Sequence, residues 1–208
     1  MNALGQNGTT GGAAGPTVTV TNSTDLAHYA GLNTPYTIQV AGRITFDDMI
    51  TVVANKTIVG LGSTAETALV GHSDTYTQDV GHLRVTYHHN FFDGTDQRHP
   101  RVRFGDPVHV FNNYYRDNAL YGVASTMDAG VLVEGNYFEN VPFPCHSASG
   151  YADSGPGRLV QRNNIFTGSG PCEVAGTVAE PRTYYAYTVD SPAGVPSTVR
   201  GGVGVGKL

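Results

Sequence analysis

The sequence predicts an all-β fold, a parallel β-helix, from an internal repeat. Four octets share one pattern: VTYHHNFF from Val85, VHVFNNYY from Val108, VLVEGNYF from Val131 and LVQRNNIF from Leu159. Their sixth position is always asparagine, and the intervals of 23, 23 and 28 residues separate Asn90, Asn113, Asn136 and Asn164. Each asparagine follows a β-branched or apolar run and precedes two apolar or aromatic residues. Repeats of this length are typical of solenoids.

The residue types of the repeat favour strands over helices. A helical solenoid spaces apolar residues three and four apart, whereas these segments alternate and are rich in Val, Tyr, Phe and Asn. Turns stacked at about 4.8 Å place equivalent residues in ladders. Asparagine suits a ladder because its side-chain amide both donates and accepts hydrogen bonds. The residue also tolerates the left-handed backbone of a sharp bend. We therefore interpret the four asparagines as structural rather than as glycosylation or catalytic sites, and the pairs after them as stacks: Phe91–Phe92, Tyr114–Tyr115, Tyr137–Phe138 and Ile165–Phe166.

The segments outside the repeat complete a single domain over residues 1–208. YTIQVAGRITF and ITVVANKTIVGLGS predict earlier strands, with Ile38 and Ile58 one short turn apart. TDLAHYA, from Thr24 to Ala30, combines an N-cap with helix formers and predicts a short N-terminal capping helix. We expect residues 1–16 to be a flexible glycine-rich start. Residues 173–208 are expected to form a tail on the outside of the coil, anchored by Tyr184, Tyr185 and Tyr187.

Composition excludes several classes of function. The 208 residues include 27 Gly and only 14% charged residues, and the formal net charge is -5. This acidic balance argues against nucleic-acid binding, which relies on an excess of Lys and Arg. No run of about 18 apolar residues could span a bilayer, and the first residues lack the charged and apolar regions of a signal peptide. We expect a soluble monomer without nucleic-acid or membrane partners.

Two cysteines, Cys145 and Cys172, enclose 26 residues of polar, glycine-rich loop and strand. They form either a disulfide or two buried free thiols, and the sequence leaves both open. A disulfide would favour an exported protein.

The stretch DQRHPRVRFG concentrates positive charge, because Arg98, Arg101 and Arg103 are three of ten arginines in a chain with two lysines. It lies between the first two octets and so belongs to one turn of a rigid coil, which suits a binding site. Along a strand Arg101 and Arg103 share one face, and Pro100 can bend the chain so that Arg98 converges with them. A solvated, partly salt-bridged edge is the alternative.

The surrounding sequence, VTYHHNFFDGTDQRHPRVRFGDPVHVFNNYY, resembles the pectate lyases of polysaccharide lyase family one. Their R-x-P-x-x-R motif lies between an HHN-type and an HV-NNYY-type strand, and here Arg98, Pro100 and Arg103 occupy it. NKTIVGLGS, LVGHSD, the early GTTGG and the closing GVGVGK resemble the same family in the same order, closest to actinobacterial-looking members. The resemblance covers most of the chain and implies a right-handed, single-stranded parallel β-helix.

The resemblance also implies a secreted lyase that cleaves α-1,4-linked polygalacturonate, an acidic polysaccharide of pectin, by β-elimination. Removal of the C5 proton builds negative charge next to the uronate carboxylate, and cations there stabilise the transition state. By resemblance Arg98 is the catalytic base, and Arg103 and Arg101 bind substrate. A guanidinium normally stays protonated, so neighbouring cations, including bound calcium, must favour its neutral form.

Calcium is the cofactor that the resemblance implies, but its usual protein ligands are missing. In the family, several turns separate the segments that resemble TIVGLGSTAE and TALVGHSD. These turns carry the acidic calcium ligands, including a D-G-x-x-D motif. Here Glu66 is followed directly by Thr67, and the lysine expected before ALVG is absent. The remaining carboxylates do not match the lost ligands by motif: Asp47, Asp48, Asp74 and Asp79. A solenoid tolerates the loss of whole turns, whereas activity is expected to be weakened or lost without calcium.

Other functions stay open at this point. The main alternative is a non-catalytic carbohydrate-binding or structural β-helix, because of the missing turns. A glycoside hydrolase needs two carboxylates a few ångströms apart, and the adjacent Asp47 and Asp48 point to opposite sides. A pectin lyase for neutral substrates is expected to line its cleft with tryptophan, and the chain has none.

Four histidines suggest a metal cluster at first sight: His88, His89, His99 and His109. However, adjacent histidines on a strand are expected to face opposite ways, and no cysteine or carboxylate completes a ligand set. Packing or ladder roles are expected instead.

Overall fold

A computed structural model describes residues 12, 14–41, 44–46, 50–61, 68–150 and 154–202. The chain divides into two compact units, residues 1–65 and residues 66–203. Several features of the sequence lie outside the described residues: most of the glycine-rich start, Asp47 and Asp48, the junction of Glu66 with Thr67, and residues 203–208. Within the described ranges, no helix combines the length and the apolar character needed to cross a membrane.

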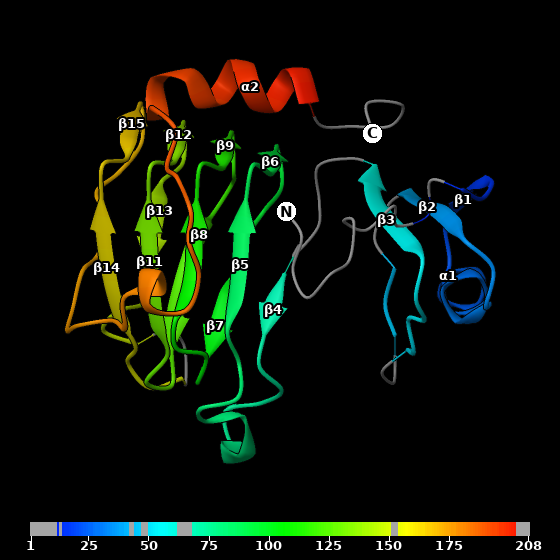
Figure 1. Ribbon diagram of the computed structural model, residues 1–208, viewed down its shortest axis with the longest axis horizontal. Coiled ribbons are helices and arrows are strands. Elements are labelled where there is room, and N and C mark those ends of the chain that lie inside the picture. Colours follow the sequence, from blue (N-terminus) through cyan, green and yellow to red (C-terminus); the bar gives the residue numbers. More distant parts are fainter. Residues whose placement is uncertain are drawn as a thin grey trace. The chain divides into compact units, whose positions relative to one another are not determined.

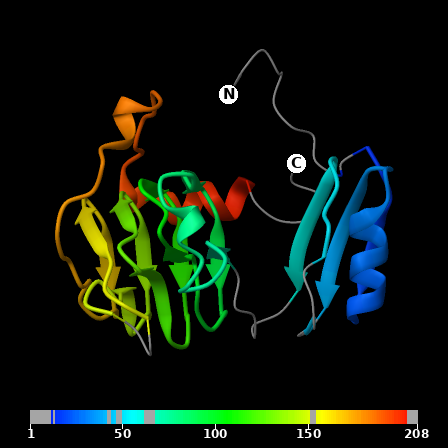
Figure 2. The ribbon, with the colours of Figure 1, turned by 90° about the horizontal axis from the view of Figure 1, so that it is seen from below.

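The first unit is a three-stranded parallel sheet with one helix. Its strands are β1 (Thr17–Val20), β2 (Tyr36–Ala41) and β3 (Lys56–Leu61), and Ile38 pairs in register with Ile58 as the repeat predicts. Helix α1 (Ser23–Gly31) confirms the predicted helix and is capped by Asn22, which accepts a hydrogen bond from the Asp25 amide. The helix lies along the sheet (Figure 2) and buries Leu26 and Ala30 against it.

The second unit confirms the parallel β-helix, with three parallel sheets of four strands each (Figure 1). The arginine sheet contains β4 (Leu69–Val70), β7 (Arg101–Arg103), β10 (Tyr121–Thr126) and β13 (Phe143–His146). The clamped sheet contains β5 (Val85–His88), β8 (Val108–Phe111), β11 (Gly130–Glu134) and β14 (Arg158–Arg162). The aromatic sheet contains β6 (Phe91–Asp93), β9 (Tyr114–Arg116), β12 (Tyr137–Glu139) and β15 (Ile165–Thr167).

Alternation along the strands fills the interior of this coil. Val102, Val108, Val110, Val123 and Val131 are all fully buried in one hydrophobic cluster. Because successive strand residues point to opposite faces, the residues between them face outward. The outer face of each sheet is therefore available for polar side chains or for a covering segment.

The asparagine ladder is confirmed where the clamped sheet turns into the aromatic sheet. Each ladder asparagine donates its side-chain amide to the next asparagine's Oδ1, at 2.8 to 3.0 Å, from Asn90 through Asn113 and Asn136 to Asn164. The ladder asparagines themselves do not adopt the left-handed conformation that asparagine tolerates. The residue before each of them has a φ of 51° to 64° instead: His89, Asn112, Gly135 and Asn163. The fifth position of the octet, rich in Asn and Gly, is the bend.

The aromatic pairs form two kinds of stack, as predicted. Inside the coil the rings of Phe92, Tyr115, Phe138 and Phe166 stack with centroids 4.4 to 5.3 Å apart. On the outer face of the aromatic sheet, Phe91 stacks on Tyr114 at 4.7 Å. Helix α2 (Val195–Gly202) covers this face with Val195 and Val199, and Figure 1 shows it running past β6, β9, β12 and β15.

The segment between the last turn and α2 runs over the clamped sheet. It contains two short 3-10 turns, Pro181–Thr183 and Pro192–Gly194. Tyr185 and Tyr187 make hydrogen bonds to the clamped sheet, whereas Tyr184 is 53% exposed and rests against Arg84. At the start of the segment, Cys172 forms a disulfide with Cys145 of β13, so both cysteines are oxidised.

Candidate functional site

The arginines of the R-x-P-x-x-R motif lie on and just before β7, in the arginine sheet. Val102 points into the core, so Arg101 and Arg103 share the outward face of the strand, as the alternation predicts. In register, Arg101 lies between Leu69 of β4 and Ala124 of β10. A bulky charged side chain is thus flanked by apolar neighbours on a rigid sheet, and few alternative positions are open to it.

One carboxylate connects the two arginines. Asp74, in the loop after β4, accepts a hydrogen bond from Arg103 Nε and another from Ser154 Oγ. Ser154 in turn accepts a hydrogen bond from Arg101 Nη2 at 2.5 Å. The hydrogen bond from Ser154 lowers the pKa of Asp74, burial opposes this, and the ion pair with Arg103 lowers it further. Asp74 is therefore ionised at neutral pH, and it connects Arg103 directly and Arg101 through Ser154.

Arg98 lies on the bend that precedes β7. Its φ is 65°, in the left-handed region, and a cis peptide joins His99 to Pro100. The carbonyl of Arg98 accepts a hydrogen bond from the Ala68 amide at 2.8 Å, and the Arg101 amide donates to the Ala68 carbonyl at 3.0 Å. The backbone of the bend is thus fixed to the neighbouring turn. The structure joins Arg101 and Arg103 through Asp74, and Arg98 is not part of that connection.

His99 holds this bend from the inside. Its side chain is fully buried, with Nδ1 3.0 Å from the Tyr121 carbonyl and Nε2 2.7 Å from Thr95 Oγ1. Burial lowers the pKa of His99 to about 4. The imidazole is therefore neutral, with Nδ1 donating to the carbonyl and Nε2 accepting from the threonine. This is the packing role expected of it, and it supports the arginines on either side.

The expectation that His88 and His89 face opposite ways is wrong. Their Nδ1 atoms lie 2.9 Å apart, and His89 Nε2 is 3.0 Å from Asp190 of the tail. His89 follows the last residue of β5 and has a φ of 55°, so the alternation of a strand no longer applies to it. Among the described residues, no group of three or more His, Cys, Asp or Glu side chains could hold a metal ion.

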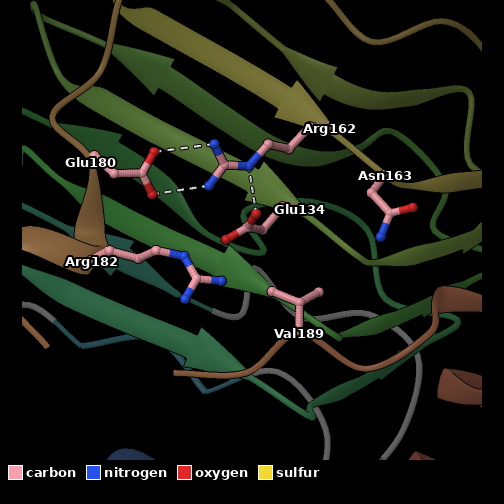
Figure 3. Close-up of a pocket in the computed structure, with 6 residues that line it drawn as sticks. All are labelled: Glu134, Arg162, Asn163, Glu180, Arg182 and Val189. Atoms are coloured by element: carbon pink, nitrogen blue, oxygen red, sulfur yellow. Dashed lines mark hydrogen bonds and ion pairs between the residues drawn. The ribbon is translucent and has the colours of Figure 1, made fainter. Parts of the chain in front are cut away.

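A second charged region, which sequence reasoning missed, lies on the clamped sheet. Arg162 bridges Glu134 and Glu180, with Nε 2.5 Å from Glu134 Oε2 and Nη2 3.0 Å from Glu180 Oε1 (Figure 3). Tyr187 donates to Glu134 Oε1 at 2.6 Å, and His109 Nε2 lies 2.8 Å from the same oxygen. The side chain of Glu134 is only 6% exposed.

The charges of this second region are matched within the protein. Burial alone would raise the pKa of Glu134, but hydrogen bonds from His109, Arg162 and Tyr187 outweigh it and lower the pKa to about 2. The pKa of Arg162 is raised by its hydrogen bonds to Glu180 and then Glu134. A pocket of about 440 Å³ borders these residues, and Arg182 lies over the Tyr187 ring at 4.3 Å. The arrangement fastens the tail to the coil rather than presenting a charge for a ligand.

Comparison with known proteins decides the family. A family model described as pectate lyase matches residues 48–208. The chain belongs to the pectate lyase family. The pectate trisaccharide-lyase of Bacillus licheniformis is 36% identical over 143 residues, covering 67% of this chain and 39% of that protein. A probable pectate lyase B of Aspergillus terreus is 28% identical over 218 residues, covering 65% of this chain and 67% of that protein.

The match lengths bear on the missing turns. This pectate lyase family member spans less than half of the Bacillus relative and about two thirds of the fungal one. The fungal alignment is 218 residues long but covers only 65% of the 208 residues here. The fungal protein therefore carries additional residues inside the matched region, which supports the interpretation that whole turns are absent.

Solved structures share the fold. Pectate lyase II from Xanthomonas campestris aligns with a TM-score of 0.55 and 23% identity, over 84% of this chain and 62% of that one. A variant of the Bacillus subtilis pectate lyase aligns with a TM-score of 0.54 and 23% identity, over 82% and 43%. At this level of identity the two alignments support the fold alone.

Proposed function

We propose that this chain is a pectate lyase that cleaves α-1,4-linked polygalacturonate by β-elimination. The observation that carries the proposal is the pair Arg101 and Arg103 on the outer face of β7, sharing one carboxylate. The pair places two guanidiniums next to each other on one strand of a protein that has only twelve Lys and Arg residues and a net charge of -5. A chain of uronate carboxylates is a ligand class that adjacent guanidiniums bind through charge-assisted hydrogen bonds.

In the proposed reaction Arg103 and Arg101 bind uronate carboxylates, and Arg98 accepts the C5 proton. The electron pair of the C5–H bond forms a double bond between C5 and C4, and the bond from C4 to the glycosidic oxygen breaks. The leaving oxygen takes a proton and becomes a reducing end, while the other fragment keeps a 4,5-unsaturated uronide. The arginines stabilise the charge that develops on the carboxylate as the proton leaves.

Calcium does not fit the residues that the structure describes. Ca²⁺ takes six to eight oxygen ligands, usually with several carboxylates. In the described part of the chain no three candidate ligands cluster, and the one carboxylate at the arginines, Asp74, is occupied by Arg103 and Ser154. No step of the proposed reaction is therefore routed through a metal ion.

The test is a polygalacturonate assay that follows the ultraviolet absorbance of the unsaturated product. Wild type is expected to form this product, and Arg98→Ala to lower kcat about 100-fold or more, as expected for loss of a general base. Arg182→Ala removes the same charge from the tail that covers the clamped sheet and is expected to leave kcat unchanged. Binding of polygalacturonate without product in every variant would support the alternative, a non-catalytic carbohydrate-binding β-helix.

We also propose that the protein is exported and monomeric. The disulfide between Cys145 and Cys172 supports an oxidising compartment, because cytosolic thiols are kept reduced. Thiol titration of the protein isolated from its native host and light scattering in solution test the two parts separately.

A further inference from the structure

Asp74 connects three segments of the coil around the arginines. It lies in the loop after β4, its partner Arg103 is on β7, and its second partner Ser154 lies in the turn before β14. Gly71 allows this loop to pass close to β7. A Cβ atom at Gly71 would lie 2.8 Å from the Arg103 carbonyl oxygen, and the φ of Gly71 is 102°.

The contact with Asp74 uses only one edge of the Arg103 guanidinium. The ion pair is made by Nε, and within the described part of the chain Nη1 and Nη2 have no protein partner. The Arg103 side chain is 14% exposed, so part of it faces solvent. The two Nη groups form the fork that binds a carboxylate through two parallel hydrogen bonds.

We propose that Asp74 is a positioning residue that holds Arg103 by Nε, so that the Nη fork is presented to a uronate carboxylate of the substrate. The inference rests on the proposed function, because it assigns a role at the same site. The alternative is that Asp74 competes with the substrate: it would then occupy the place of the substrate carboxylate and would have to be displaced from Arg103. The two possibilities predict opposite effects of removing the carboxylate.

Isothermal titration with trigalacturonate measures this without requiring turnover. Asp74→Ala frees the Arg103 side chain to move, so the affinity is expected to fall about tenfold. Asp74→Asn keeps an oxygen for Arg103 Nε while removing the charge, and a smaller loss is expected. Asp117→Asn removes one charge at an exposed site on the aromatic sheet and is expected to change nothing. Melting temperatures show whether each variant is folded.

Activity on polygalacturonate adds a second readout. With Asp74→Ala, KM is expected to rise about tenfold while kcat changes less than about twofold, since the base is not altered. Tighter binding by both Asp74 variants would show competition and overturn the proposal, and so would unchanged binding by Asp74→Ala. Arg103→Ala separates the two levels of inference. If its affinity equals that of wild type, the proposed substrate site is wrong; if only Asp74→Ala is unchanged, the positioning role alone is wrong.

Discussion

Two networks of arginine and carboxylate lie on the outer faces of neighbouring sheets, and they differ in the number of arginines and carboxylates that they join. On the arginine sheet, two arginines share one carboxylate, Asp74. On the clamped sheet, one arginine lies between two carboxylates, Glu134 and Glu180, with His109 and Tyr187 completing the set. The first network connects two guanidiniums through one aspartate, and the second holds one guanidinium between two glutamates.

The networks also differ in cover. The Asp74 side chain is 31% exposed, whereas that of Glu134 is 6% exposed because the tail lies over it. The arginines differ in the opposite direction, with Arg103 14% and Arg162 43% exposed. Loss of the arginine therefore leaves Glu134 as a desolvated charge, whereas the more exposed Asp74 can be solvated. The same residue types attach the tail on the clamped sheet, and under the proposed function they bind substrate on the arginine sheet.

Two matched substitutions break this comparison most directly. Arg103→Ala is expected to lower the affinity for trigalacturonate about 100-fold, because a charge-assisted bidentate contact is lost. Its effect on the free energy of unfolding is expected to stay below about 1 kcal/mol, because the Asp74 that remains is 31% exposed and can be solvated. Arg162→Ala is expected to do the reverse, lowering the free energy of unfolding by about 2 kcal/mol with affinity unchanged, because Glu134 loses one of its buried contacts. Urea unfolding and titration calorimetry on both variants measure the two effects.

The outcome is decisive in either direction. Equal losses of stability in both variants would show that the arginine sheet also uses its ion pairs for folding. A loss of affinity with Arg162→Ala would mean that the pocket beside Glu180 takes part in binding.

Acid sharpens the comparison, because the pKa of Glu134 is lowered to about 2 from an unfolded value near 4.5. A carboxyl with a depressed pKa in the folded state stabilises the fold above the unfolded pKa, and this contribution is lost as the pH falls through the folded pKa. The clamp is therefore at full strength above about pH 4.5 and weakens toward pH 2. After allowance for the partial exposure of Arg162, the change is about 2 kcal/mol.

Thermal melts of wild type and Glu134→Gln between pH 7 and pH 2 measure this contribution. The difference in melting temperature between the two proteins is expected to be constant at neutral pH and to shrink in the acid range. A difference that stays constant down to pH 2 would mean that the charge of Glu134 contributes nothing to attachment of the tail.

The sequence predicts one of these networks better than the other for a physical reason. Arg101 and Arg103 are two residues apart on one strand, so alternation alone places them on the same face. Their partner Asp74 is reached only through the stacking of turns, 29 residues away in sequence from Arg103. The clamp depends on a tail that has no repeat, and Glu134 meets Tyr187 across 53 residues. Spacing rules carry no information about such a contact.

At the bends, too, the sequence predicts one feature and not another. The asparagine ladder follows from a repeated residue type, and amide chemistry was sufficient to predict its hydrogen bonds. The left-handed position one residue earlier was missed, because the fifth position of the octet varies between His, Asn and Gly. The shared backbone preference of Asn and Gly at the fifth position predicts the left-handed residue, although the residue type itself is not repeated. His89 then explains why the two neighbouring imidazoles face each other.

The smallest expected effect separates residues within the tail itself. Tyr187 donates to the buried Glu134, whereas the neighbouring Tyr184 is 53% exposed and contacts Arg84 through its ring. Tyr187→Phe removes one hydrogen bond to a charged group and is expected to lower the free energy of unfolding by about 1.5 kcal/mol. Tyr184→Phe keeps the ring contact and is expected to have no measurable effect. Urea unfolding of both variants, with limited proteolysis of the tail, tests the pair. Equal stability of the two variants would mean that the tail is held by its apolar contacts and the disulfide. The difference between the clamped sheet and the arginine sheet would then be one of packing rather than of charge.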